Sequence, residues 1–213
     1  HAITKGYIVE DIVYKAEAFD SEFLKMLQHD KEILEYLNKD WKKEKDDPKF
    51  NEFLDNLNNI FFDKDINPSG KLVLFSESVD TLNYLQKRLT EELGRKDVLM
   101  VTAKNRKHLI KTIKENFDAY YNSDKKEYNI IITSDVLAEG VNLHRSNVII
   151  NYDSPWNATR LMQRIGRVNR IGSVAPKIYN FMFYPSQQGD KEIQLYKNAL
   201  VKLILRTSFQ SSS

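Results

Sequence analysis

The stretch Ile130-Ile131-Ile132-Thr133-Ser134-Asp135 places three apolar β-branched residues directly before two hydroxyl residues and an acid. The same change from apolar to polar occurs at Leu72-Val73-Leu74-Phe75-Ser76 and at Val98-Leu99-Met100-Val101-Thr102. Short apolar runs without polar alternation are typical of strands buried on both faces of a parallel sheet. Two further runs, Val148-Ile149-Ile150 and Ile178-Tyr179-Asn180-Phe181, extend the predicted sheet.

Helical patterns near 78–93, 106–120 and 156–170 lie between these runs. Strands that alternate with helices predict an α/β fold, in which helices cover both faces of a mainly parallel sheet. The fold class that we expect is therefore α/β with three layers.

The flanking segments predict further helices. Before residue 42, apolar residues recur at helical spacing (Phe19, Phe23, Leu24, Leu27, Ile33, Leu34 and Leu37). A charged stretch over 42–47 breaks this pattern, Pro48 suits the first position of a new helix, and 67–70 is a turn. A closing helix is expected over about 188–207. We expect a helical segment at 1–46, a domain at 47–207 and a frayed tail at 208–213.

The composition is that of an ordinary globular protein, with 41% hydrophobic and 29% charged residues among 213 and a net charge of +2. Cysteine is absent, which excludes disulfides and cysteine zinc sites. The four histidines lack metal-ligand spacing, so no metal site is expected. No apolar run approaches the roughly 18 residues of a membrane span. We expect a cytoplasmic protein and, because the chain starts at His1 instead of Met, a piece of a longer one.

Polar residues follow four of the predicted strands, at Ser76-Glu77-Ser78, Thr102-Ala103, Thr133-Ser134-Asp135 and Asp153-Ser154-Pro155-Trp156. In an open parallel sheet the functional loops lie beyond the carboxyl ends of the strands, so these four should gather at one edge. The hydroxyls near Thr133, with the flexible backbone of Gly140, could hold phosphate oxygens of a nucleic-acid strand. Alternatively, Ser134 or Asp135 only caps a short helix.

Arginines occur at 160, 164, 167 and 170; on a predicted helix, 160, 164 and 167 fall close to one face, and 170 lies nearby at the helix end. Like charges at this spacing repel each other unless an anion or several acids offset them. Guanidinium groups match phosphate oxygens well, and an arginine at a transferring γ-phosphate raises the rate by about 10³–10⁵. The alternatives are a solvated basic face, or pairing with acids such as Asp153 or Glu139.

A weaker basic cluster follows the second predicted strand, and it could contact a phosphate backbone or form a solvated face (Lys104, Arg106, Lys107, His108 and Lys111). No Gly-x-x-x-x-Gly-Lys-Ser/Thr loop occurs, and no Asp-Glu metal-binding pair follows an apolar run. A candidate set of transition-state arginines without a phosphate-binding loop is what half of an active site would contain.

Ordered motifs resemble those of superfamily 2 helicases. Residues 131–143 resemble motif V, 163–172 resemble motif VI, and 72–82 resemble motif IV with its helix. The likeness is greatest to the Snf2-like group, which includes bacterial RNA-polymerase-associated ATPases, because Gly140-Val141-Asn142-Leu143 and Asp153-Ser154-Pro155-Trp156-Asn157 are similar to its Gly-Leu-Asn-Leu and Asp-x-x-Trp-Asn-Pro. The resemblance implies the second RecA-like domain of a motor, cytoplasmic and bacterial.

The resemblance also implies roles by position. Arg167 and Arg170 would be arginine fingers, supported by the interface residues Gln163 and Arg164, with Gly140 and Asn142 beside the nucleotide. Nucleic-acid contacts would come from Ser76, Thr102, Thr133 and Ser134. ATP and Mg²⁺ would be held mainly by an N-terminal RecA-like lobe, and the track would be duplex DNA. The alternative is a non-catalytic nucleic-acid or protein-binding module that retains this fold, against which the presence of both fingers argues.

Overall fold

The computed structural model describes residues 19–184 except 45, 124, 138–139 and 156–157. The chain divides into two compact units, at 1–48 and 49–213. In the first unit, helix α1 (Ser21–Trp41) follows Asp20, whose carboxylate accepts a hydrogen bond from the amide of Glu22. The predicted N-terminal helix is confirmed, and it ends just before the charged stretch. The closing helix at 188–207 and the tail at 208–213 lie outside the described residues.

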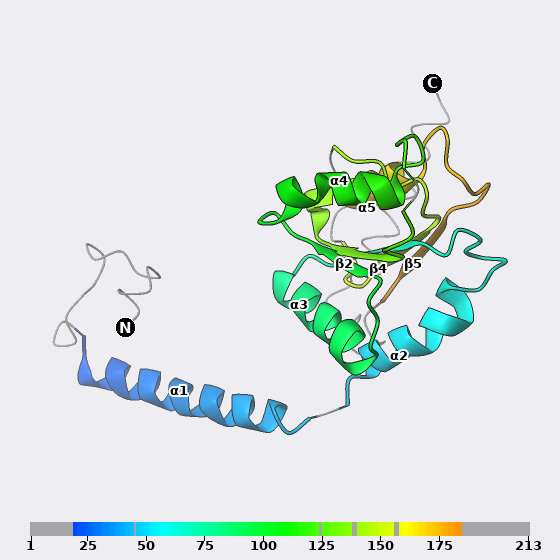
Figure 1. The fold of residues 1–213 in the computed structure, drawn as a ribbon. Helices are drawn as coiled ribbons and strands as arrows, with labels where there is room; N and C mark the ends of the chain where they lie inside the picture. The colour runs from blue at the N-terminus through cyan, green and yellow to red at the C-terminus, as the bar shows by residue number, and fades with distance from the viewer. Residues whose placement is uncertain (1–18, 45, 124, 138–139, 156–157, 185–213) are drawn as a thin grey trace, which may run out of the picture. The chain divides into compact units, whose positions relative to one another are not determined.

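The second unit contains the predicted sheet (Figure 1). Its strands are β1 (Leu72–Phe75), β2 (Val98–Val101), β3 (Ile130–Thr133), β4 (Val148–Asn151) and β5 (Tyr179–Met182). They lie in the order β2-β3-β1-β4-β5, and every neighbouring pair is parallel. All five apolar runs therefore form strands, and the sheet described is wholly parallel where the sequence predicted a mainly parallel one.

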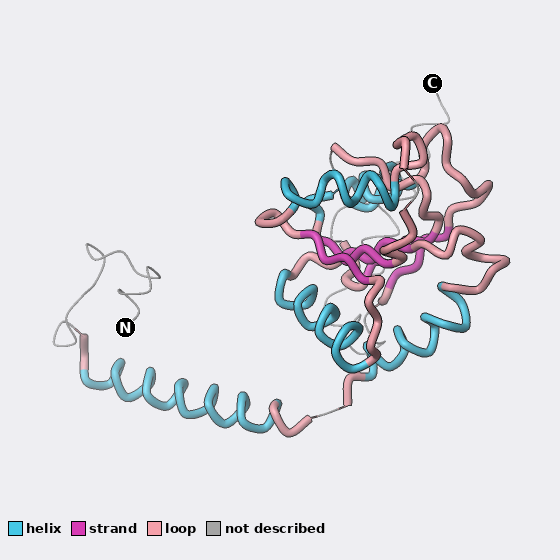
Figure 2. The backbone as a smooth tube through the Cα atoms, viewed as in Figure 1, coloured by secondary structure: helices cyan, strands magenta, loops and turns pink. Residues whose placement is uncertain are grey.

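Helices cover both faces of this sheet (Figure 2). The helical elements are α2 (Pro48–Asn56), the π-helical turn η3 (Leu57–Phe61), α3 (Val79–Lys87), the π-helical turn η4 (Arg88–Glu92), α4 (Arg106–Phe117), the 3₁₀ turn η5 (Asp135–Leu137) and α5 (Ala158–Val168). The helical elements α2, η3, α3 and η4 cover one face of the sheet, and α4 and α5 cover the other. The predicted three-layer α/β arrangement is confirmed.

Two helices are shorter than the sequence predicted. Helix α4 ends at Phe117 because Asp118 adopts an extended backbone (φ −96°, ψ 115°), so the predicted continuation to 120 is wrong. Helix α5 ends at Val168, where the prediction continued to 170. The amide of Arg170 donates instead to the carbonyl of Val168 and to the hydroxyl of Ser173. Residues 169–170, at the end of the arginine segment, therefore lie outside the helix.

Two hydrophobic cores fix the layers, one on each face of the sheet. Phe50, Phe53 and Leu82 pack against one face, and Ile113, Phe117 and Val168 pack against the other. Burying a large apolar side chain stabilises a fold by about 1.5–3 kcal/mol, so both helical layers are firmly attached. In the described part of the chain, no helix has the length and apolar character needed to cross a bilayer.

Candidate functional site

Because the strands are parallel, the polar loops that follow them meet at the carboxyl edge of the sheet, as predicted. The Ser76 hydroxyl after β1 donates a short hydrogen bond to Asp153 after β4. Lys49 Nζ lies 3.0 Å from the other oxygen of Asp153. Burial raises the pKa of Asp153, but the hydrogen bonds from Ser76 and Lys49 and the charge of Lys49 outweigh burial and hold that pKa below its ordinary value. Polar contacts therefore connect the loop after β1, the loop after β4 and the start of α2 at this edge.

The four hydroxyl residues predicted to contact nucleic acid differ in exposure. Ser76, Thr102 and Thr133 are buried, whereas Ser134 is half-buried. The hydroxyl of Thr133 donates to the carbonyl of Val101 over 2.9 Å, and the hydroxyl of Ser76 donates to Asp153. The hydroxyls of Ser76 and Thr133 thus join strands and loops of the domain, the hydroxyl of Thr102 donates to Asn105 in its own loop, and Ser134 presents part of its surface outward.

Arg164 and Arg160, on the first two turns of α5, are engaged by carboxylates. The Arg164 side chain is fully buried, with Nε 2.6 Å from Asp135 Oδ1 and Nη1 3.0 Å from Asn151 Oδ1. Exposed Arg160 reaches the same Asp135 at 3.4 Å and Glu77 at 3.3 Å. Arg164, predicted at the ATP-site interface, therefore lies inside the domain, where it joins α5 to the loop after β3.

Among the described residues, Glu77 and Asp135 pair with these arginines, and Asp153 does not. Asp153 instead pairs with Lys49 and accepts a hydrogen bond from Ser76. Glu139 lies outside the described residues. In the described part of the chain, the Asp135 carboxylate pairs with Arg160 and Arg164.

Arg170 has a different environment. Its side chain is exposed, and its Nη1 donates to Asn142 Oδ1 over 2.6 Å while its Nε donates to the carbonyl of Gly166 over 3.0 Å. Both acceptors are neutral, and among the described residues no carboxylate pairs with Arg170. Two of the predicted site residues, Arg170 and Asn142, are thus bonded to each other, and the guanidinium retains its charge at the surface.

The other predicted residues lie around this pair. The carbonyl of half-buried Arg167 accepts a hydrogen bond of 2.9 Å from the amide of Leu143, which joins α5 to the loop before β4. Gly140 has φ +77°, a backbone conformation that favours glycine, and a Cβ there would come within 2.8 Å of Nη2 at the end of the Arg106 side chain. Gln163 is exposed on α5. The structure brings Asn142 together with the end of the arginine segment, and Gly140 lies two residues before Asn142 in the same loop.

Two residues that the sequence did not single out support this arrangement. Asp118, after α4, accepts a hydrogen bond of 3.4 Å from Asn142 Nδ2. His144 is buried, with Nε2 3.7 Å from Asp118 Oδ1. Burial lowers the pKa of His144, and the charges of Arg170 and Arg145 lower it further, although Asp118 opposes them. No motif marks Asp118, because only the folded chain brings it to Asn142.

The described residues contain no group of three His, Cys, Asp or Glu side chains that could hold a metal ion. At its exposed end the site presents the Arg170 guanidinium, which donates to the side-chain amide of Asn142. Such donors suit phosphate oxygens, to which guanidinium groups form charge-assisted hydrogen bonds.

Comparison with known proteins gives matches along most of the domain. The family model of the helicase conserved C-terminal domain matches residues 48–172, which is more than half of the chain. The chain is similar to a probable ATP-dependent RNA helicase ddx51 of Dictyostelium discoideum, at 30% identity over 48% of this chain and 18% of that protein. An uncharacterized ATP-dependent helicase YqhH of Bacillus subtilis is 51% identical over 20% of this chain and 8% of its own length.

A putative ATP-dependent RNA helicase MJ1505 of Methanocaldococcus jannaschii is 25% identical over 84% of this chain and 22% of its length. The chain thus spans less than a third of each of these relatives. A solved structure, the C-terminal part of the Fun30 ATPase domain, superimposes with a TM-score of 0.53 at 20% identity, covering 79% of this chain and 53% of that one. This likeness shows the fold. With the family model matched over the motif-bearing residues, the chain belongs to the helicase conserved C-terminal domain family.

Proposed function

We propose that this chain is the C-terminal RecA-like lobe of an ATP-dependent nucleic-acid motor and that Arg170, with Arg167, completes an ATP site built mainly by an N-terminal lobe. The observation that supports this most is the contrast within one segment. Arg164 and Arg160 bind carboxylates, whereas Arg170 is exposed and held by neutral acceptors. A fixed, unneutralised guanidinium suits the charge that develops at a transferring phosphoryl group.

The residues present fit the phosphate part of ATP. Arg170 would contact the γ-phosphate, and Asn142 and Gly140 would lie beside the nucleotide. Asn142 keeps the Arg170 guanidinium at a fixed position, since it accepts from Nη1 and donates to Asp118. Bound Mg-ATP supplies the phosphoryl group and a metal that neutralises its oxygens. Because no carboxylate cluster lies in the described part of this chain, we assign the Mg²⁺ ligands to the partner lobe.

The first test concerns turnover by this chain alone. We expect the purified 213-residue chain to show no ATP hydrolysis above background with or without nucleic acid, because no phosphate-binding loop occurs in its sequence. A phosphate-release assay measures this. Addition of an N-terminal lobe bearing such a loop, tethered to this chain, should restore nucleic-acid-stimulated turnover. Robust hydrolysis by the chain alone would contradict the half-site proposal, and failure of the tethered pair would favour a non-catalytic module.

We further propose that the track is duplex DNA. The Snf2-like features Gly140-Val141-Asn142-Leu143 and Asp153-Ser154-Pro155 support this choice. Ser134, half-buried at the carboxyl edge, is the direct phosphate contact, while buried Ser76, Thr102 and Thr133 position the loops. Several relatives are named RNA helicases, so RNA is the competing track.

The tethered two-lobe protein distinguishes the two tracks. We expect its ATP turnover to be stimulated more by a 30-base-pair DNA duplex than by single-stranded RNA of the same sequence. Fluorescence anisotropy with labelled strands, at matched salt, would report affinity separately, because phosphate contacts make affinity depend strongly on salt. Stronger stimulation by RNA would reject the DNA assignment and leave the ATP-site proposal intact.

A further inference from the structure

The exposed guanidinium of Arg170 is connected, through one amide, to a buried carboxylate. Asn142 Oδ1 accepts from Arg170 Nη1 over 2.6 Å, and Asn142 Nδ2 donates to Asp118 Oδ2 over 3.4 Å. Asp118 is only 7% exposed, although it stands at the point where the chain leaves α4. A buried carboxylate is costly unless hydrogen bonds satisfy its oxygens, so the donors around Asp118 have to come from the domain itself.

Main-chain hydrogen bonds hold together the three segments that this network crosses. The amide of Arg145 donates to the carbonyl of Phe117 over 3.0 Å, which places the end of α4 beside the loop that contains Asn142. The amide of Leu143 donates to the carbonyl of Arg167 over 2.9 Å, which joins the same loop to α5. With the backbone fixed on both sides, the remaining freedom is the orientation of the Asn142 amide, which can turn over without moving the main chain.

Asp118 determines that orientation. A guanidinium can only donate hydrogen bonds, and an ionised carboxylate can only accept them. Asn142 lies between one of each, so a single orientation of its amide satisfies both neighbours, with Nδ2 toward Asp118 and Oδ1 toward Arg170. The opposite orientation would place two donors against each other at Arg170 and two acceptors against each other at Asp118.

The segment that follows Asp118 anchors it. The amide of Tyr120 donates to Asp118 Oδ1 over 3.0 Å, so the two carboxylate oxygens have separate donors. The Tyr120 hydroxyl donates to the carbonyl of Ile171 over 3.0 Å, and its ring packs on the buried His144 ring with the centres 5.0 Å apart. Because Ile171 follows Arg170 directly, residues 118–120 contact the end of the arginine segment through its main chain as well as through Asn142.

We infer that Asp118 is a positioning residue for Arg170, which it orients through Asn142 and not by direct pairing. This inference rests on the proposed role of Arg170 as an arginine finger. A carboxylate in direct contact would neutralise the guanidinium, as Asp135 does for Arg164. One amide between the two groups fixes the guanidinium and leaves its charge for a phosphoryl group, whose stabilisation depends on donors that are already in place.

The first arm of the test measures ATP turnover by the tethered two-lobe protein with Asp118→Asn. This replacement keeps a side-chain oxygen for the amide of Tyr120 and loses the acceptor for Asn142, so it separates the local turn from the positioning role. We expect kcat to fall about tenfold, the effect of one lost hydrogen bond, with a nearly unchanged Kd for ATP. In an Arg170→Ala background, Asp118→Asn should lower kcat by less than about twofold more, because both residues act through one contact.

The second arm uses the isotope-labelled 213-residue chain and does not depend on catalysis. Arg170 Nε donates to the carbonyl of Gly166 over 3.0 Å, so its Hε proton should be protected from exchange with water. Asp118→Asn should speed this exchange by about threefold or more in NMR spectra, because the Asn142 amide no longer holds the guanidinium in place.

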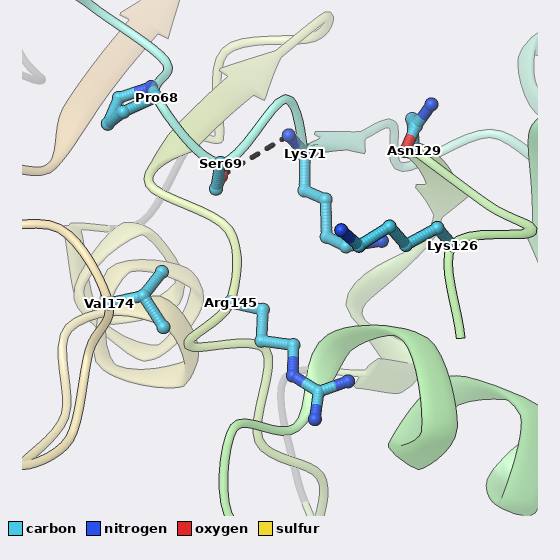
Figure 3. Close-up of a pocket in the computed structure, with 7 residues that line it drawn as sticks. All are labelled: Pro68, Ser69, Lys71, Lys126, Asn129, Arg145 and Val174. Atoms are coloured by element: carbon cyan, nitrogen blue, oxygen red, sulfur yellow. Dashed lines mark hydrogen bonds between the residues drawn. The ribbon is translucent and has the colours of Figure 1, made fainter. Parts of the chain in front are cut away.

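Asp97→Asn is the matched control, because it makes the same replacement at another carboxylate that accepts from an asparagine. Asn129 Nδ2 donates to Asp97 Oδ2 over 3.0 Å, and Asn129 lines a cavity beside the start of β3 (Figure 3). Asp97 and its partners Arg95 and Asn129 lie outside the network of Asp118, Asn142 and Arg170. Both kcat and the exchange of the Arg170 Hε proton should therefore stay within about twofold in this variant.

The outcomes distinguish the positioning role from the proposed function on which it rests. An unchanged kcat in Asp118→Asn, together with a lowered kcat in Arg170→Ala, would overturn the positioning role and leave the proposed ATP site intact. An unchanged kcat in Arg170→Ala would instead contradict the proposed function. Equal losses from Asp118→Asn with and without Arg170→Ala would show that Asp118 affects turnover by another route. Unchanged exchange of the Arg170 Hε proton in Asp118→Asn would likewise count against the inference.

Discussion

In a motor assembled from this lobe and its N-terminal partner, Arg170→Ala is expected to lower the kcat of ATP hydrolysis by about 10³-fold or more. The guanidinium is exposed and held by Asn142 and the carbonyl of Gly166, a position in which it can meet a phosphoryl group without breaking an ion pair. An interaction made mainly in the transition state changes kcat and leaves ground-state binding largely intact. Stopped-flow binding of a fluorescent ATP analogue should therefore give a nearly unchanged Kd.

Arg160→Ala is the matched control, because it removes the same side chain type from the same segment. Arg160 is exposed and its partners are Glu77 and Asp135, so kcat should stay within about threefold of the unaltered protein. Arg170→Lys should remain strongly impaired, since an ammonium cannot reproduce two directed guanidinium contacts. Equal losses in Arg160→Ala and Arg170→Ala would remove Arg170 from the finger role and indicate a general effect of positive charge in this segment.

The sheet could be predicted because the apolar runs are short, uninterrupted and separated by helical patterns. Ile130–Ile132 and Val148–Ile150 contain no polar residue, and burial on both faces requires that composition. The ends of the helices were less predictable. The sequence gives no reason for Asp118 to be extended, and the hydroxyl of Ser173, which accepts from the amide of Arg170, reaches that amide only after the chain has turned.

The candidate site was predictable as a group of residues but not as a set of distinct environments. The spacing gives no reason to distinguish Arg160, Arg164 and Arg170, because the first two fall close to one face of a predicted helix and Arg170 lies nearby at its end. The fold separates them through residues distant in sequence. Asp135, 29 positions before Arg164, binds Arg164 and reaches Arg160, whereas Asn142 reaches Arg170.

The ion pair between Asp135 and Arg164 leads to the second large effect. Asp135→Ala is expected to lower the free energy of unfolding by about 3 kcal/mol, because it leaves the guanidinium of Arg164 buried without its carboxylate. Asn151 Oδ1 remains as a neutral acceptor at 3.0 Å, and it cannot replace the charge of Asp135. Urea unfolding followed by circular dichroism measures this change as a lower midpoint at an unchanged slope.

Two further variants separate the buried pair from the surface charges around it. Glu77→Ala removes a partner of exposed Arg160 and should cost less than about 1 kcal/mol. Arg164→Met combined with Asp135→Ala removes the buried charge together with its partner, so it should recover at least half of the loss seen in Asp135→Ala. If the double variant were less stable than Asp135→Ala, the buried cation would not be the cause of the loss. The guanidinium would then contribute mainly through its packing on Phe75, whose ring centre lies 5.0 Å away.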